Sequence, residues 1–185
     1  MSRQYFNETV SWAVTSGAAI ASTTAETIIF PDVSIPGGFM FDGRALRLRA
    51  IGQYSNTGTP TLIFTVRWGG VAGTILCKTA ACTTPSGVTA AMWDLDVIIQ
   101  TRTSGSSGTV MANGRACVFA AVAGTVSVAA GDALVTPMTN GGVGTPAAVT
   151  LDLTATANLS LTATWSASSA SNTLTGLSYT IEALN

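Results

Sequence analysis

Two carboxylates that could form a catalytic pair, Asp94 and Asp96, lie two residues apart in the sequence. A glycosidase uses one carboxyl group as acid and a second as base or nucleophile, and it usually holds them across a cleft on different elements. Here both aspartates fall in one alternating segment, 91–102, where residues two apart point to the same face. The spacing therefore favours ion pairs or a solvated face over catalysis, and it leaves a calcium or glycan contact open.

Arginines at matching positions provide partners for these two carboxylates. Arg47 and Arg49 lie on one face of the alternating segment 45–54, and Arg67 lies on the polar face of 61–68. Opposite charges on neighbouring strands form cross-strand pairs when they share a face. We therefore predict cross-strand ion pairs that draw on Arg47, Arg49, Arg67, Asp94 and Asp96.

The chain lacks the residues that other catalytic sites and metal-binding sites require. The chain contains no histidine, so a serine nucleophile would have no imidazole base. Neither the G-x-S-x-G spacing nor a phosphate-binding loop is present. Cys77, Cys82 and Cys117 are too few and too dispersed for a zinc site. We predict that the protein is not an enzyme and uses no cofactor or metal.

The number of cysteines and the low charge indicate in which compartment the protein is made and which classes of partner it can bind. A Cys77–Cys82 bridge could close a short loop, but three thiols make no disulfide framework, which favours reduced, intracellular synthesis. Charged residues make up 9% of the chain and Lys78 is its single lysine, so the clustered positive charge that nucleic acid requires is missing. No apolar stretch reaches the roughly 20 residues of a membrane helix. We expect neither nucleic acid nor a membrane as partner.

Apolar and polar residues alternate through most of the chain, and glycine, proline and asparagine interrupt the alternation at turns. Strands are predicted at 26–30, 45–54, 61–68, 74–79, 91–102, 109–121, 148–155, 159–166 and 177–184. These spacings are typical of a sandwich. The predicted fold is all-β: a two-sheet antiparallel sandwich of the jelly-roll type, with about eight to nine strands and an extended N-terminal arm.

Domain organisation follows from the same pattern. Residues 1–25 are rich in small and hydroxyl residues and are predicted to form an N-terminal arm or edge strand, and 26–185 a single β-sandwich domain. The region 122–147 is rich in glycine and is expected to be a long loop with at most one short strand. Its part 138–146 should lie at an exposed tip or at an interface.

The alternation of apolar and polar residues also indicates on which face of a predicted strand each large apolar side chain lies. Trp68, Trp93 and Trp165 fall on apolar strand faces and are predicted to pack in the core. In the last strand, alternation places Leu177 on one face with Tyr179, Ile181 and Ala183. Trp12 lies in the arm without a predicted strand partner. The arm residues Tyr5, Phe6 and Trp12 are predicted to bury apolar area against a partner.

The segment DGRALRLRAIGQYSNTGTPTLIFTVRWGGVAGTIL resembles one found in virion structural proteins of tailed bacteriophages. There, a strand rich in leucine and arginine precedes a TGTPTL turn and a VRWGG strand. The C-terminal LSLTATWSASSASNTLTGLSYTIEAL is similar to the closing strand pair of the same proteins. The resemblance covers roughly residues 26–110 and 150–185. It implies a jelly-roll virion protein, either a head decoration or spike component or a tail component, assembled in the host cell cytoplasm.

We therefore expect a non-enzymatic virion structural protein that decorates or stabilises the capsid through oligomeric contacts. Its expected partners are other copies of itself, in a trimer or another ring, and the major capsid protein or neighbouring virion proteins. The alternative is a tail-associated adhesin or carbohydrate-binding module that contacts a host glycan. That alternative needs exposed aromatic platforms, for which Tyr54 and Tyr5 are the plausible residues.

Overall fold

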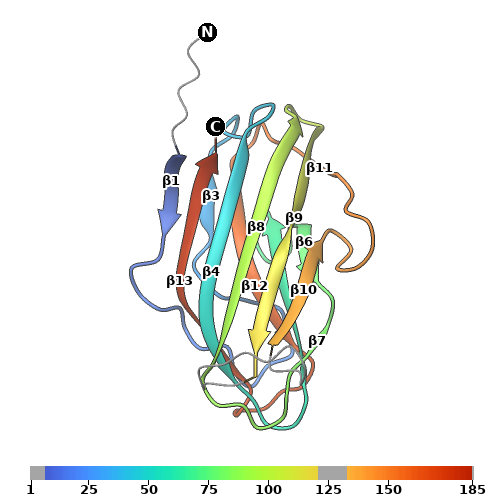
Figure 1. Cartoon of the computed structure of the whole chain (residues 1–185). Helices are drawn as coiled ribbons and strands as arrows, with labels where there is room; N and C mark the ends of the chain where they lie inside the picture. Colours follow the sequence, from blue (N-terminus) through green and yellow to red (C-terminus); the bar gives the residue numbers. More distant parts are fainter. Residues whose placement is uncertain (1–6, 121–132, 185) are drawn as a thin grey trace.

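The computed structural model describes residues 7–120 and 133–184, and every regular element in them is a β-strand (Figure 1). The strands form one continuous hydrogen-bonded sheet that folds over into two layers. The pairings between strands are antiparallel, so the prediction of an all-β antiparallel sandwich is confirmed.

The front layer in Figure 1 contains the longest strands. In spatial order it consists of β1 (Asn7–Trp12), β13 (Thr173–Leu184), β4 (Ala45–Ser55), β8 (Ala91–Thr103), β9 (Gly108–Phe119) and β10 (Ala133–Thr139). Buried and more exposed residues alternate along β4, β8 and β9, which is the pattern of strands with one face on a core and the other toward solvent. β10 lies within the region 122–147, for which one short strand was expected.

The sheet continues through β10 into the back layer, because β10 pairs with β9 and also with β6. The back layer consists of β6 (Thr74–Thr79), β5 (Thr61–Trp68), β12 (Ala157–Trp165) and β2 (Thr27–Ile28), with β3 (Val33–Ile35) on β12 and β7 (Cys82–Thr83) on β5. β11 (Val149–Leu151) pairs with β9.

The described residues thus hold thirteen strands rather than the eight or nine predicted. The four strands without a counterpart among the nine predicted ranges are β1, β3, β7 and β10. β3 and β7 have three and two residues and are too short to show alternation, whereas β1 and β10 lie in the arm and in the region 122–147. The jelly-roll type stays a prediction.

The core lies between the two layers and combines aliphatic side chains with several large aromatic ones. Trp68, Trp93 and Trp165 are 7%, 0% and 1% exposed, which confirms their predicted place in the core. The rings of Phe64 and Trp93 have centroids 5.0 Å apart, and those of Tyr54 and Trp165 are 6.4 Å apart. Both pairs are tilted, in the favoured range of aromatic contacts.

Leu177 departs from the face that it was predicted to share with Tyr179, Ile181 and Ala183: those three residues are buried, whereas Leu177 is 41% exposed. The pairing of β13 with β4 shifts register between Gly176 and Ser178, so one extra residue is accommodated there. Such a bulge reverses the alternation locally and turns Leu177 outward.

The N-terminal segment lies along the sandwich of its own chain. β1 pairs with β13, and further on the amide of Gly17 donates to the carbonyl of Gly176 while Ile20 forms a bridge with Leu174. The segment from β1 to Ile20 therefore follows β13 as an edge of the front layer. Tyr5 and Phe6, two of the three predicted partner contacts, lie outside the described residues.

Tyr54 should not ionise until strongly alkaline pH. Its hydroxyl donates to the carbonyl oxygen of Phe119 at 2.6 Å, and burial raises the pKa of Tyr54 to about 12 from 10.0. Because the folded-state pKa lies above the unfolded one, this contribution to stability is complete below pH 10 and is lost as the pH rises toward 12. Ultraviolet titration of the phenolates should show one late transition that Tyr54→Phe removes. If every tyrosine ionises at its ordinary pKa, the burial of this hydroxyl is wrong.

Candidate interaction surface

The outward side of the front layer, called here the outer face, is made of the side chains of β1, β13, β4, β8, β9 and β10 that point away from the core. Strand register fixes which of these residues are neighbours. One row crosses all six strands, and it consists of Trp12, Thr180, Arg49, Asp96, Arg115 and Pro137. This central row places a carboxylate between two arginines.

Two further rows flank the central row. On one side lie Glu182, Arg47, Ile98 and Asn113. On the other side lie Ser178, Ile51, Asp94, Cys117 and Val135. Together the three rows carry three arginines and three carboxylates in a chain of which 9% is charged. The outer face is therefore rich in charge but balanced in sign.

Asp96 is the centre of an ion-pair cluster. The guanidinium of Arg47 donates two hydrogen bonds to its carboxylate, at 2.9 and 2.5 Å, and Nε of Arg49 lies 3.8 Å from Oδ2. The hydrogen bonds from Arg47 hold the pKa of Asp96 below its ordinary value, although partial burial opposes them. The structure thus brings together three of the five residues predicted to form cross-strand ion pairs.

Asp94 shares the face of Asp96, as alternation predicted, but it takes part in no ion pair among the described residues. It lies opposite Ile51 on β4 and Cys117 on β9. Burial, and then the adjacent carboxylate of Asp94, raise the pKa of the Cys117 thiol. No sequence signal pointed to Cys117 as a neighbour of Asp94, because the register between β8 and β9 brings them together.

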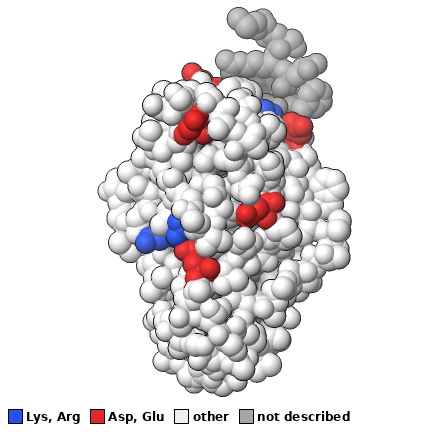
Figure 2. All heavy atoms as spheres, turned by 180° about the vertical axis from the view of Figure 1, so that it is seen from behind, with Lys and Arg blue, Asp and Glu red and all other residues white. Residues whose placement is uncertain are grey.

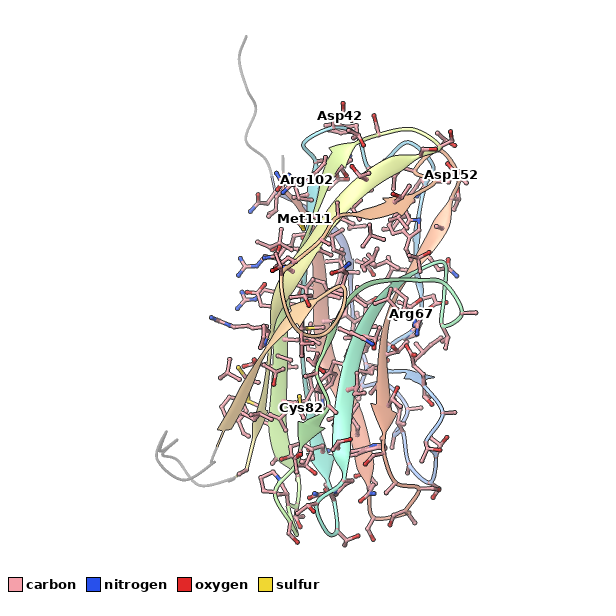
Figure 3. All side chains as sticks on the ribbon, turned by 90° about the vertical axis from the view of Figure 1, so that its right-hand side faces the viewer. Asp42, Arg67, Cys82, Arg102, Met111 and Asp152 are labelled. Atoms are coloured by element: carbon pink, nitrogen blue, oxygen red, sulfur yellow. The ribbon has the colours of Figure 1, made fainter. Side chains whose placement is uncertain are left out.

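Arg67 does not join this cluster, and its predicted pairing with the aspartates of β8 is wrong. It lies on β5 in the back layer (Figure 3), where its guanidinium donates to both carboxylate oxygens of Glu26 at 2.6 and 2.7 Å. The hydroxyl of Thr162 donates to the same carboxylate. Burial alone would raise the pKa of Glu26, but the hydrogen bonds from Arg67 and Thr162 outweigh it and lower that pKa.

Apolar side chains stand among the charges of the outer face. Ile51, Met92 and Ile98 are 44%, 46% and 42% exposed, and Trp12 and Val135 are each 60% exposed. Clustered exposed apolar side chains between polar ones are typical of a surface that contacts another macromolecule. Figure 3 shows nitrogen-tipped side chains projecting from the same face.

Two shallow hollows lie on the outer face beside Asp96. One has a volume of about 260 Å³ and is lined by polar groups that include Arg49, Asp94 and Thr180. The other, of about 330 Å³, is lined by residues that include Ile98 and Asn113. Each opens onto the sheet surface, so the face offers recesses for side chains of a partner.

Three other predicted contact features have these outcomes. Tyr54 is 1% exposed, so its prediction as an aromatic platform is wrong, because it faces the core from β4. Trp12 is instead the exposed aromatic residue of the outer face. The segment 138–146 was expected to lie at an exposed tip or at an interface. In it, β10 ends at Thr139, and Val143 in the loop that follows is 67% exposed.

The residues that the structure describes contain no group of three metal-ligating side chains. Cys77, Cys82 and Cys117 are free thiols, so the bridge left open by the sequence is absent. Nowhere in 7–120 or 133–184 does a helix occur with the length and apolar character needed to cross a bilayer.

Comparisons of the chain with protein-family models, with curated proteins and with solved structures found no match.

Proposed function

We propose that this chain is a non-enzymatic structural protein of a tailed-phage virion, which decorates or stabilises the head through contacts of its β-sandwich. The observation that carries the proposal is the outer face, where exposed isoleucine, methionine, valine and tryptophan side chains alternate with balanced charges. A surface of this composition stabilises protein contacts through burial of the apolar groups and selects partners through the charges.

The carboxylates support a structural role better than a catalytic one. Asp96 is held by Arg47 and flanked by Arg49, so it is neutralised by its neighbours. Asp94, two residues away, lies on the same strand and not across a cleft. An acid and a base on opposite sides of a bound substrate are therefore not available at this pair.

The resemblance to phage virion proteins supplies the virion part of the proposal. The first resembling segment includes β4, β5 and the beginning of β6, and the second includes β12 and β13. These strands belong to both layers and carry much of the core. The resemblance supports a place in the particle after synthesis in the host cytoplasm, with the major capsid protein or neighbouring virion proteins as partners.

A tail-associated adhesin or carbohydrate-binding module is the second candidate, and Trp12 favours it. Its side chain is 60% exposed at one end of the central row. Thr180 lies beside it on β13, and Arg49 follows on the next strand, β4. Sugars bind where an aromatic face lies near polar groups. Tryptophan fluorescence during titration with neutral oligosaccharides discriminates the candidates, since an adhesin should show a saturable change that Trp12→Ala abolishes.

Phage heads that lack this chain provide the direct test of the proposed function. Heads from a phage with the gene deleted should release DNA at lower temperature than wild-type heads. Purified chain added to them should bind saturably and restore the wild-type release temperature. A chain unfolded before addition is the control. Deleted heads that bind no added chain and match the wild type in stability would contradict the proposal.

A further inference from the structure

We propose that Asn140 is a site of spontaneous modification, at which attack by the backbone nitrogen of Gly141 converts the side-chain amide to a carboxylate. The inference goes beyond the proposed function and does not depend on it. It assigns to the turn after β10 a slow change of charge beside Lys78, the single lysine of the chain.

The chain contains two asparagine–glycine pairs, and the fold places them in different surroundings. The pair Asn140–Gly141 occupies the two central positions of a turn, in which the amide of Gly142 donates to the carbonyl of Thr139 at 3.0 Å. This turn begins the loop that joins β10 to β11 at the side of the sandwich (Figure 1). The other pair, Asn113–Gly114, lies inside β9. The same dipeptide is thus present once in a turn and once in a paired strand.

Asparagine is a chemically labile residue, and its conversion needs only the chain and water. The backbone nitrogen of Gly141 gives up its proton and bonds to Cγ of Asn140, the bond from Cγ to Nδ2 breaks, and the side-chain nitrogen leaves as ammonia. One water molecule then opens the resulting five-membered imide at either of its two carbonyls. Opening at one carbonyl gives aspartate, and opening at the other gives isoaspartate, in which the main chain runs through the former side chain.

The groups of the turn favour this attack. Gly141 is exposed and has no Cβ to shield its nitrogen, and within 7–120 and 133–184 no group accepts a hydrogen bond from its amide. The amide of Ala147 donates to Oδ1 of Asn140 at 3.3 Å. A donor at this oxygen stabilises the negative charge that develops there as the nitrogen adds to Cγ. The turn therefore combines an accessible nucleophile with a polarised carbonyl.

The pair inside β9 is protected by the sheet. Gly114 pairs with Val97 on one side and with Met138 on the other. A Cβ atom at Gly114 would lie 2.2 Å from a backbone oxygen of β8, so the strands are closely packed there. Ring closure requires Asn113 to rotate out of the extended conformation, and this rotation would break the pairing of β9. Asn113 should therefore persist where Asn140 reacts.

The new carboxylate would lie beside Lys78. Register pairs Thr139 of β10 with Lys78 of β6, and a Cβ atom at Gly142 would lie 3.3 Å from Cε of the same lysine. Lys78 forms no ion pair among the described residues. Figure 2, which views the back layer, shows its charged groups scattered singly or in small groups. Conversion of Asn140 would therefore give Lys78 a counter-ion and make the formal net charge of −1 more negative by one unit.

Peptide mapping of the native full chain after incubation in mildly alkaline buffer tests the site. Digestion in acid keeps further conversion from occurring during the assay. Asn140 should gain the mass that corresponds to replacement of NH2 by OH, with isoaspartate present beside aspartate. It should convert at least about tenfold faster than Asn113, because a paired strand opens far less often than a turn. In chain unfolded in urea, the two asparagines should convert at similar rates, since a glycine follows each of them.

Gly141→Ala is the matched variant, because its methyl group shields the attacking nitrogen. It should slow the conversion of Asn140 several-fold and leave Asn113 unchanged. The nearest atom to the added Cβ lies 3.4 Å away, so the fold should be kept.

Asn140→Asp tests the placement of the charge. A carboxylate beside Lys78 favours its charged form and should slow acylation of its amine by about twofold, the size expected of an exposed ion pair.

Three results would overturn the inference. If Asn140 persists in the native chain as long as Asn113, or converts at an unchanged rate in Gly141→Ala, the turn is not a modification site. If Lys78 is acylated equally fast in the wild type and in Asn140→Asp, the new carboxylate does not lie beside it. None of these results affects the binding of the chain to deleted heads, so a failure of the inference is distinguishable from a failure of the proposed function.

Discussion

Gly52→Ala should lower the free energy of unfolding by about 3 kcal/mol, at the upper end of the usual effect of overpacking. Gly52 lies in the middle of β4, between Gly176 of β13 and Trp93 of β8. A Cβ atom at this position would lie 2.1 Å from the carbonyl oxygen of Thr175 and 2.4 Å from two ring carbons of Trp93. Trp93 is 0% exposed and packs against Phe64, so its indole has no free space to move into.

Gly141→Ala is the matched control for this substitution. Gly141 lies after the end of β10, and the closest atom to an added Cβ is the carbonyl oxygen of Val143 at 3.4 Å. Urea unfolding of both variants should place Gly141→Ala within about 0.5 kcal/mol of the wild type. Equal stabilities of the two variants would show that the indole of Trp93 does not lie over Gly52.

Glu26→Gln should lower the free energy of unfolding by about 2 kcal/mol at neutral pH, because it leaves the guanidinium of Arg67 without its counter-ion. The side chains of Arg67 and Glu26 are 16% and 22% exposed, so the expected loss lies below that of a fully buried pair. Glu8→Gln is the control, since Glu8 pairs with Arg44 at 3.3 Å but its side chain is 60% exposed. The control should change stability by less than about 0.5 kcal/mol.

The same pair predicts a direction for the pH dependence. The pKa of Glu26 is lowered from 4.5 in the folded protein, so its contribution is present above pH 4.5 and is lost as the pH falls through the folded-state pKa. The difference in stability between wild type and Glu26→Gln should therefore shrink in acid. A difference that stays constant from pH 7 to pH 3 would contradict the ion pair as its cause.

Alternation along the chain was enough to predict the long strands and the core. β5 and β12 carry Trp68 and Trp165 on apolar faces that the residue pattern shows directly, and each of these residues is buried. The short strands β3 and β7 exist because a longer neighbour provides hydrogen bonds, and pairing leaves no mark on local composition. The bulge at Leu177 likewise depends on the register with β4.

The outer face was predictable only in part, for a related reason. Alternation places Asp94 with Asp96, and Arg47 with Arg49, on common faces, but only the antiparallel register of β4 and β8 decides that Asp96 is the shared partner. Arg67 has the same residue type and alternation as Arg47. Its assignment to the other layer follows from topology, which no local pattern contains.

Arg115 and Glu182 carried no signal in the sequence because each is an isolated charge in an apolar or hydroxyl-rich strand. Strand register alone places Arg115 beside Asp96 and Glu182 beside Arg47. A search for outward charges on predicted neighbouring strands would have found them once the strand order was known.

The number of copies of this chain in purified phage particles tests the central claim most directly. Quantitative mass spectrometry with the major capsid protein as internal reference should find tens to hundreds of copies per particle, in a constant ratio to that protein. A handful of copies would contradict a place on the head and favour a tail adhesin. Complete absence from the particles would contradict the proposal of a virion structural protein.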